Sequence, residues 1–175
     1  IIIPHYNSPQ LLRKLLDSIP KKSEIEIIVV DDRSDKYIEE YEKIKKEESY
    51  RVKFLENSAG KKGAGTCRNI GLASASGKWI LFADADDYFL PDFYKKVSKH
   101  FESNYDVIFF TPTSIYLENN QPSTRHLGYK KLIEDYLNNA EDSELKLRYH
   151  FRSPCSKMMR LNFIKDHKIY CDEVI

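Results

Sequence analysis

Residues 79–87 read WILFADADD, an apolar run that is followed at once by three aspartates within four positions. The apolar part has the length and character of a β-strand that is buried on both faces. The carboxylates of Asp84, Asp86 and Asp87 repel one another unless a cation lies between them. Mg²⁺ and Mn²⁺ prefer oxygen ligands and are often held by one or two carboxylates together with substrate phosphates. The stretch therefore predicts a strand that ends at a site for a divalent metal.

Outward from this stretch, apolar runs of strand length alternate with amphipathic helical stretches through the first two thirds of the chain. Such alternation is typical of crossover units, so we expect an α/β fold with a mainly parallel, twisted sheet and helices on both faces. The predicted strands are residues 1–3, 25–30, 51–55, 79–83 and 107–110. The second, fourth and fifth are continuously apolar, which predicts that helices cover both of their faces.

Helix start signals fit the same pattern. Ser8 followed by Pro9 predicts an N-cap with proline in the first turn, and Pro91 predicts the start of a later helix. Residues 37–48 are dense in Lys and Glu and predict a helix with a solvated face.

The last third is less regular. Residues 111–124 predict loop and a short strand, and helices are expected at 127–137 and 161–167. No internal repeat or low-complexity linker interrupts the sequence, so residues 1–175 are expected to form one domain. The chain begins inside a strand without Met and stops at Ile175 with no element completed, which predicts a fragment of a longer protein.

Composition excludes several classes of function. The 28 basic and 27 acidic residues leave a net charge of +1, which offers no field for attracting nucleic acid or an anionic membrane. No apolar run approaches the roughly 20 residues of a membrane span. Cys67, Cys155 and Cys171 are odd in number and form no C-x-x-C pair, which argues against disulfides and structural zinc and predicts a reducing cytoplasm. The five histidines lack metal-ligand spacing, and none is assigned a catalytic role.

Polar residues follow the predicted strands at their carboxyl ends, where open parallel sheets bind ligands. The first strand is followed by Pro4, Tyr6 and Asn7, and the second by Asp31 and Asp32. An isolated D-x-D more often caps a helix or occupies an exposed turn. Here three polar clusters follow neighbouring strands, so we expect them to converge on one crevice.

The same residues have both structural and binding interpretations. One of Asp31 and Asp32 is expected to form a turn, and the other to accept hydrogen bonds from a nucleobase or a ribose. Tyr6 either packs against the sheet edge or stacks on the base. The glycine-rich stretch 60–69 matches no phosphate-loop motif, but its Arg68 either bonds to the base or diphosphate or is a surface arginine.

Together these positions resemble the family 2 glycosyltransferases, which have the GT-A fold, and in particular the bacterial members that build polysaccharides. The matching positions are Pro4-x-Tyr6-Asn7, Asp31-Asp32-x-Ser34, Arg68-Asn69-x-Gly71, Gly77, Asp84-Ala85-Asp86-Asp87 and Pro91-Asp92. The similarity covers most of residues 1–112, which it identifies as the nucleotide-sugar-binding half. Residues 113–175 match loosely and would begin the half that binds the acceptor.

The resemblance implies inverting transfer of a sugar from a nucleoside diphosphate donor, usually a UDP-sugar, to a hydroxyl of a saccharide or lipid-linked acceptor. It places such an enzyme in the cytoplasm, with the inner face of the membrane as a site of action for the longer protein. Asp86 and Asp87 are implied as ligands of Mn²⁺ or Mg²⁺. The implied nucleotide-binding residues are Pro4, Tyr6, Asn7, Asp32, Arg68 and Asp84.

The general base of the transfer is expected beyond Ile175, and Asp172 and Glu173 are the candidates within the chain. Two other functions compete with this interpretation. A sugar nucleotidyltransferase has a glycine-rich loop directly after its first strand, where this chain has PHYN at residues 4–7. A non-catalytic module that binds nucleotide-sugars would lack the carboxylates that are expected after residue 175.

Overall fold

The structure, a computed structural model, describes residues 1–116 and 118–173. Its strands are β1 (Ile2–His5), β2 (Ile27–Asp31), β3 (Val52–Glu56), β4 (Trp79–Leu81), β5 (Val107–Phe109) and β6 (Lys157–Arg160). Its helices are α1 (Pro9–Ser18), α2 (Ile38–Glu48), α3 (Ala64–Ser74), α4 (Phe93–Ser98), α5 (Leu127–Leu137), α6 (Ser143–His150) and α7 (Leu161–Asp166). Within the described residues, none of these helices has both the length and the apolar character needed to cross a membrane.

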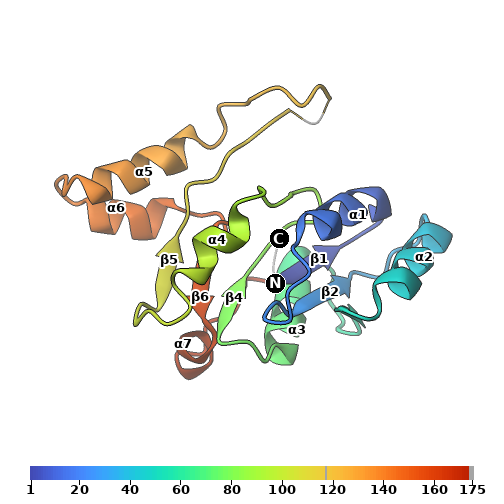
Figure 1. Cartoon of the computed structure of the whole chain (residues 1–175). Helices are drawn as coiled ribbons and strands as arrows, with labels where there is room; N and C mark the ends of the chain where they lie inside the picture. The colour runs from blue at the N-terminus through green and yellow to red at the C-terminus, as the bar shows by residue number, and fades with distance from the viewer. Residues whose placement is uncertain (117, 174–175) are drawn as a thin grey trace.

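The strands form two three-stranded sheets that meet at the centre of the molecule (Figure 1). One is parallel, with β1 and β3 on either side of β2, and the other is antiparallel, with β6 between β4 and β5. Ile2 of β1 pairs with Phe82 just after β4, and its carbonyl accepts a hydrogen bond of 3.1 Å from the N–H of Ala83. This contact joins the two sheets into the order β3-β2-β1-β4-β6-β5.

Helices cover both faces of the parallel sheet, as the continuous apolar runs predict (Figure 1). Ile3, Ile27 and Val29 face a core with α1 and α2, which supply Leu12, Leu15, Leu16, Tyr41 and Ile44. The alternate residues Ile28 and Val30 face a second core with α3 and α7, which supply Cys67, Leu72, Leu161 and Ile164. All five residues of β2 are therefore buried.

Several predicted boundaries differ from the observed ones. Strand β1 ends at His5 instead of residue 3, because His5 pairs with Asp31 of β2. Strand β4 ends at Leu81, and the helix expected at Pro91 begins at Phe93. Helices α5 and α7 lie where they were predicted to within one residue, and residue 117 of the predicted 111–124 loop lies outside the described residues.

Three features of the second sheet differ from the prediction. The residues of β5 are only partly buried, so the expected burial on both faces is wrong for this strand. Strand β6 was not predicted, because its sequence KMMR lacks the β-branched and aromatic residues that mark strands. Helix α6 was missed as well, since Leu147 is its one buried apolar residue and no apolar stripe marks it.

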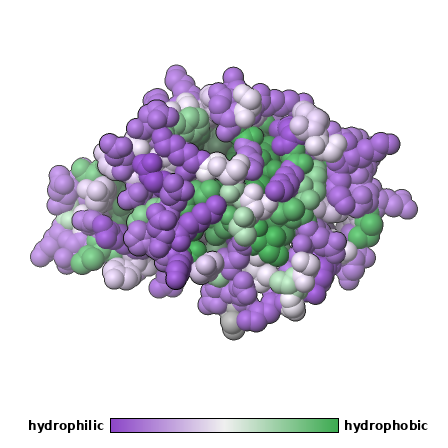
Figure 2. Space-filling view, turned by 90° about the horizontal axis from the view of Figure 1, so that it is seen from below, coloured by the Kyte–Doolittle hydropathy of each residue, from purple (hydrophilic) through white to green (hydrophobic). Residues whose placement is uncertain are grey.

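Figure 2 shows the molecule from below, relative to the view of Figure 1, and apolar side chains gather near the middle of this otherwise polar face. A groove of about 230 Å³ lies at the amino ends of the strands, lined by Ile1, Ile25, Trp79, Phe93, Phe101 and others. It is at the opposite end of the sheet from the polar clusters that follow the strands, so it is separate from the candidate site.

Helix α3 approaches β1 closely at Gly71, where a Cβ atom would come within 2.3 Å of Cγ2 of Ile2. We expect Gly71→Ala to lower the free energy of unfolding by about 1–3 kcal/mol, because the added methyl group forces the helix away from the strand. Gly128→Ala is the matched control, since Gly128 lies in α5 with open space around it. There, in the first turn of the helix, the substitution should raise stability slightly, by less than about 1 kcal/mol. Urea denaturation of both variants measures the difference, and equal effects would contradict this packing.

Candidate functional site

The strand ends that carry the polar clusters converge at one edge of the sheet. His5, the last residue of β1, pairs with Asp31, the last residue of β2. Asp31 in turn pairs with Glu56, the last residue of β3. On the other side of β1, the pairing of Ile2 with Phe82 sets Asp84 near the level of Pro4. The expected acidic and polar residues therefore lie along one edge of the sheet, and a crevice at this edge stays a prediction.

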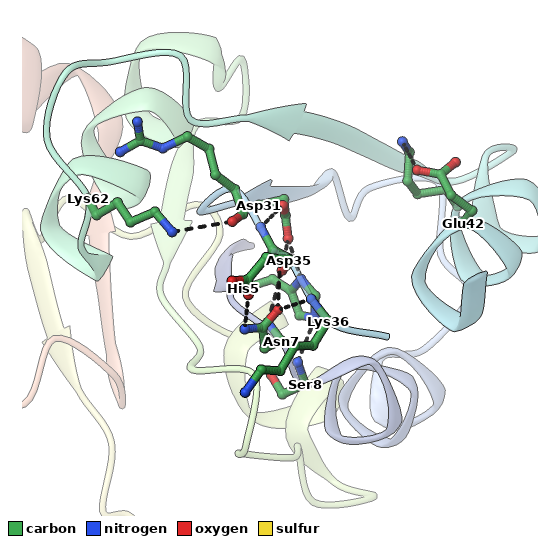
Figure 3. A network of polar contacts seen from close by, with 11 residues as sticks. His5, Asn7, Ser8, Asp31, Asp35, Lys36, Glu42 and Lys62 are labelled. Atoms are coloured by element: carbon green, nitrogen blue, oxygen red, sulfur yellow. Dashed lines mark hydrogen bonds and ion pairs between the residues drawn. The ribbon is translucent and has the colours of Figure 1, made fainter. Parts of the chain in front are cut away.

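Asp31 is the turn former of the aspartate pair. One of its carboxylate oxygens accepts hydrogen bonds from the backbone N–H of Ser34 at 2.8 Å, and the other from the Ser34 hydroxyl at 2.7 Å. Nδ1 of the buried His5 lies 2.7 Å from the same carboxylate (Figure 3). The backbone N–H of Ser8 points at Nε2 of His5, which assigns the ring proton to Nδ1 as a donor to Asp31.

The charge of Asp31 is stabilised by these contacts. Burial by itself raises the pKa of the Asp31 carboxyl group, but the hydrogen bonds from His5 and Ser34 outweigh burial and lower the pKa below the ordinary value. His5 also stacks on Tyr41 of α2, with ring centroids 4.6 Å apart. The pair therefore anchors the ends of β1 and β2 to the core beneath them.

Asn7 joins the loop after β1 to the loop after β2 (Figure 3). Its side-chain oxygen accepts hydrogen bonds from the backbone N–H groups of Asp35 and Lys36, at 3.0 and 2.9 Å. Its amide nitrogen donates to the Asp35 carboxylate at 2.7 Å. The side chain thus holds the two loops together, and a direct contact of Asn7 with a nucleotide stays a prediction, as it does for Pro4.

Tyr6 projects from the loop after β1, and about half of it is exposed (48%). The ammonium group of Lys62 lies 4.7 Å from the centroid of its ring, and the Tyr6 hydroxyl lies 3.4 Å from Asp35. An exposed aromatic ring at the carboxyl edge of the sheet offers a stacking surface.

Asp32 is buried, and two hydrogen-bond donors hold its carboxylate in one orientation. Oδ1 accepts a hydrogen bond of 2.6 Å from the side chain of Asn57, and Oδ2 accepts one of 2.8 Å from the backbone N–H of Gly63. Each carboxylate oxygen has a second lone pair, so Asp32 can accept further hydrogen bonds. Asn57 is fully buried and was missed by the sequence analysis, although its place directly after β3 was a signal.

Asp84, Asp87 and Cys155 come together at the acidic turn. One ligand atom of each lies within 4.8 Å of the others. Asp86 and Asp87 are both exposed residues, and Asp86 lies outside this group. Arg68 of α3 forms an ion pair with Asp84, so it faces the turn and is not a free surface arginine. Its Nε atom is buried and has no hydrogen-bond partner among the described residues.

The pKa shifts in this group have the signs expected of crowded anionic ligands. Burial and the charge of Asp84 raise the pKa of the Asp87 carboxyl group. Burial, followed by the charges of Asp84 and Asp87, raises the pKa of the Cys155 thiol. A divalent cation at this place would oppose both shifts. Two carboxylates and a thiol are a donor set that fits such a cation.

The two candidates for a general base lie against α3. The side-chain amide of Asn69 donates to the carbonyl of Cys171 at 3.0 Å and to Oε1 of Glu173 at 2.8 Å. A Cβ atom at Gly65 would come within 1.8 Å of the backbone oxygen of Asp172. This segment is therefore fitted closely to the helix. Ile175, beyond which the base is expected, lies outside the described residues.

The family model for glycosyl transferase family 2 matches residues 1–168. The poly(ribitol-phosphate) beta-N-acetylglucosaminyltransferase TarS of Staphylococcus aureus (strain MW2) is 29% identical over 179 residues, which cover 99% of this chain and 29% of TarS. The crystal structure of S. aureus TarS 1-349 in complex with UDP matches with a TM-score of 0.70 and 28% identity, over 98% of this chain and 49% of that chain. The complex of TarS 1-349 with UDP-GlcNAc matches with a TM-score of 0.70 and 26% identity, over 97% of this chain and 47% of that chain. The chain thus spans less than half the length of these relatives.

The contacts of Asp31 predict a pH-dependent contribution to stability. We expect Asp31→Asn to lower the free energy of unfolding at neutral pH by about 1.5–3 kcal/mol, the usual value of hydrogen bonds to a charged group. Because the folded-state pKa is lowered, this stabilisation is full above the unfolded-state pKa of about 3.9 and is lost as the pH falls through the folded-state value. Urea denaturation at neutral pH and near pH 3 measures it. Asp17→Asn, at an exposed position of α1, is the control. A difference that persists unchanged near pH 3 would exclude this origin.

Proposed function

Because the chain belongs to glycosyl transferase family 2, we propose that it binds a nucleoside diphosphate sugar, with a UDP-sugar as the donor. On this proposal it is part of an inverting glycosyltransferase that transfers the sugar to a hydroxyl of a saccharide or lipid-linked acceptor in cell-surface polysaccharide synthesis. TarS, the relative with UDP and UDP-GlcNAc complexes, supports the choice of a uridine nucleotide. Family membership argues against a sugar nucleotidyltransferase.

One observation carries the proposal: an aromatic ring, a buried carboxylate and an acidic turn with an arginine lie along one edge of the sheet. Tyr6 and Asp32 follow β1 and β2, whereas Asp84 and its partner Arg68 lie beyond the next strand. A nucleoside diphosphate sugar has a flat base at one end and a negatively charged diphosphate further along. The order of the side chains along the edge suits that shape.

We place the base between the Tyr6 ring and the Asp32 carboxylate. Uracil has an imide N–H, which a carboxylate can accept, and Asn57 and Gly63 hold Asp32 in one orientation for it. Lys62, now over the Tyr6 ring, would have to move aside or lie against the base. Pro4 and Asn7 would shape the loop that presents Tyr6.

We place the diphosphate at the acidic turn, with Mn²⁺ or Mg²⁺ held by Asp87 and Asp84 and, after a movement of its exposed side chain, by Asp86. When bound, such a cation neutralises charge on the departing diphosphate. Arg68 pairs with Asp84 in this structure. With the carboxylate engaged elsewhere, the guanidinium group would be free to donate to a phosphate oxygen.

Removal of the acceptor proton requires a base that the acidic turn does not supply, since its carboxylates are assigned to the cation. Glu173 already accepts a hydrogen bond from Asn69, and Asp172 lies on the same segment against α3. We therefore propose that the general base of the longer enzyme lies after residue 175. The enzyme would act in the cytoplasm, at the inner face of the membrane.

The metal part of the proposal is tested by calorimetry of UDP binding. We expect UDP to bind at least about tenfold more tightly with Mn²⁺ than with excess EDTA, a difference of about 1.4 kcal/mol. Asp86→Asn and Asp87→Asn should each remove most of that difference. Asp135→Asn, at a partly exposed position of α5 where the carboxylate pairs with Lys131, is the control and should keep it. Equal affinity in Mn²⁺ and EDTA would exclude a metal-bridged diphosphate.

The position of the uracil base is tested separately. Asp32→Asn replaces an acceptor-only group by one that also donates, so it should weaken UDP binding by about tenfold or more. Binding of pyrophosphate with Mn²⁺ should change little, because that ligand has no base. Calorimetry with UDP, ADP and pyrophosphate measures both effects, with circular dichroism as a check of folding. Tighter binding of ADP than of UDP by the unsubstituted protein would place the base elsewhere.

A further inference from the structure

Cys155 lies at the acidic turn although nothing in the proposed function requires a thiol there. Its backbone pairs with Phe82, the residue that also pairs with Ile2 of β1. Strand β6, which begins two residues later, runs between β4 and β5 (Figure 1). The sheet therefore fixes Cys155 beside the end of β4, two residues from the start of the acidic turn.

The side chain of Cys155 is directed into the turn. Its sulfur, one oxygen of Asp84 and one of Asp87 all lie within 4.8 Å of one another. Burial, followed by the charges of Asp84 and Asp87, raises the pKa of the Cys155 thiol, as expected for a sulfur that lies beside two carboxylates. Ligand atoms from two distant segments of the chain thus surround one point.

The chemistry of this donor set differs from that of a site built from oxygen alone. Mg²⁺ takes oxygen ligands and gains little from sulfur, whereas Zn²⁺, Co²⁺ and Cd²⁺ bind thiolate together with carboxylate. A sulfur within reach of the cation therefore changes which metals the site prefers.

The other two thiols provide a comparison within the same chain. Cys67 is fully buried in the core beneath α3. Cys171 is partly buried like Cys155, but its backbone pairs with Asn69 and it is not part of the three-residue group. Cys171 is thus a matched control for the effect of removing a thiol near α3.

We propose that Sγ of Cys155 is a third ligand of the cation at the acidic turn, so that the site prefers thiophilic divalent metals to Mg²⁺. The inference rests on the proposed function, in that a divalent cation binds with the diphosphate. On binding, the S–H bond breaks, a bond between sulfur and metal forms, and the proton passes to the solvent. The oxidation states of the metal and the sulfur do not change.

The test uses Co²⁺, whose bond to a thiolate gives a charge-transfer absorption in the near ultraviolet. With UDP present, the unsubstituted protein should develop this absorption and release one proton for each Co²⁺ bound. Cys155→Ser should lose the absorption, and Cys171→Ser should keep it. Circular dichroism and thermal unfolding establish that both variants fold.

Metal preference is a second measurement, made by competition among Cd²⁺, Mn²⁺ and Mg²⁺. Mutation of a group that only hydrogen-bonds to a metal ligand lowers metal affinity by about 10–100-fold. Removal of a direct thiolate ligand should have at least this effect on Cd²⁺, so Cys155→Ser should lower the ratio of Cd²⁺ to Mg²⁺ affinity by about tenfold or more. Cys171→Ser should leave the ratio unchanged.

The two proposals fail in different ways. UDP binding that depends on Mn²⁺, with no thiolate absorption for Co²⁺ or with absorption that persists in Cys155→Ser, would overturn the role of Cys155 alone. UDP binding that depends on no divalent metal would overturn the metal part of the proposed function as well.

Discussion

The position of β1 between β2 and β4 is the constraint on which the site depends. Ile2 pairs on one side with Ile28 and on the other with Phe82, so a single residue sets the register of the two sheets. A shift of one residue would turn alternate side chains to the opposite face and would move the strand ends apart. Gly71 allows α3 to approach this strand closely, which brings Arg68 to the acidic turn.

Polar residues at the carboxyl edge divide into those that hold the loops and those that remain available to a ligand. A buried charge is tolerated only with hydrogen-bonding partners, and the contacts of Asp31 with His5 and Ser34 meet that requirement. All of these hydrogen bonds join Asp31 to other groups of the protein. Asp32, the next residue, is held by two donors and its two oxygens can accept further hydrogen bonds, which is why we assign ligand binding to Asp32 and a structural role to its neighbour.

The sequence was sufficient for those parts of the fold that local patterns specify. The apolar runs gave β1 to β4, and turn chemistry after β2 indicated that one aspartate of the pair would form the turn. Strand β6 could not be found in this way, because it pairs with strands some 50–80 residues earlier in the chain and has no strand-like composition. For the same reason the sequence offered no sign that Cys155 meets Asp84, since that contact depends on the register of β6 and not on spacing along the chain. The family to which the chain belongs was recognised because its motifs follow β1, β2 and β4, the elements that local patterns do specify.

The binding of a cation and of a diphosphate at the acidic turn both depend on the charges of its side chains. Three carboxylates follow β4, and Arg68 forms an ion pair with one of them, Asp84. Burial and the charges of Asp84 and Asp86 raise the pKa of Asp87. The same negative charges oppose the approach of a diphosphate, which is itself anionic. On the proposed function, Asp84 and Asp87 would hold a divalent cation, which would supply the positive charge that the carboxylates and the phosphates lack. Arg68 would then be free of Asp84 and able to donate to a phosphate oxygen. Cation and nucleotide should therefore each strengthen the binding of the other, because each supplies charge that the other lacks, and such coupling is reciprocal.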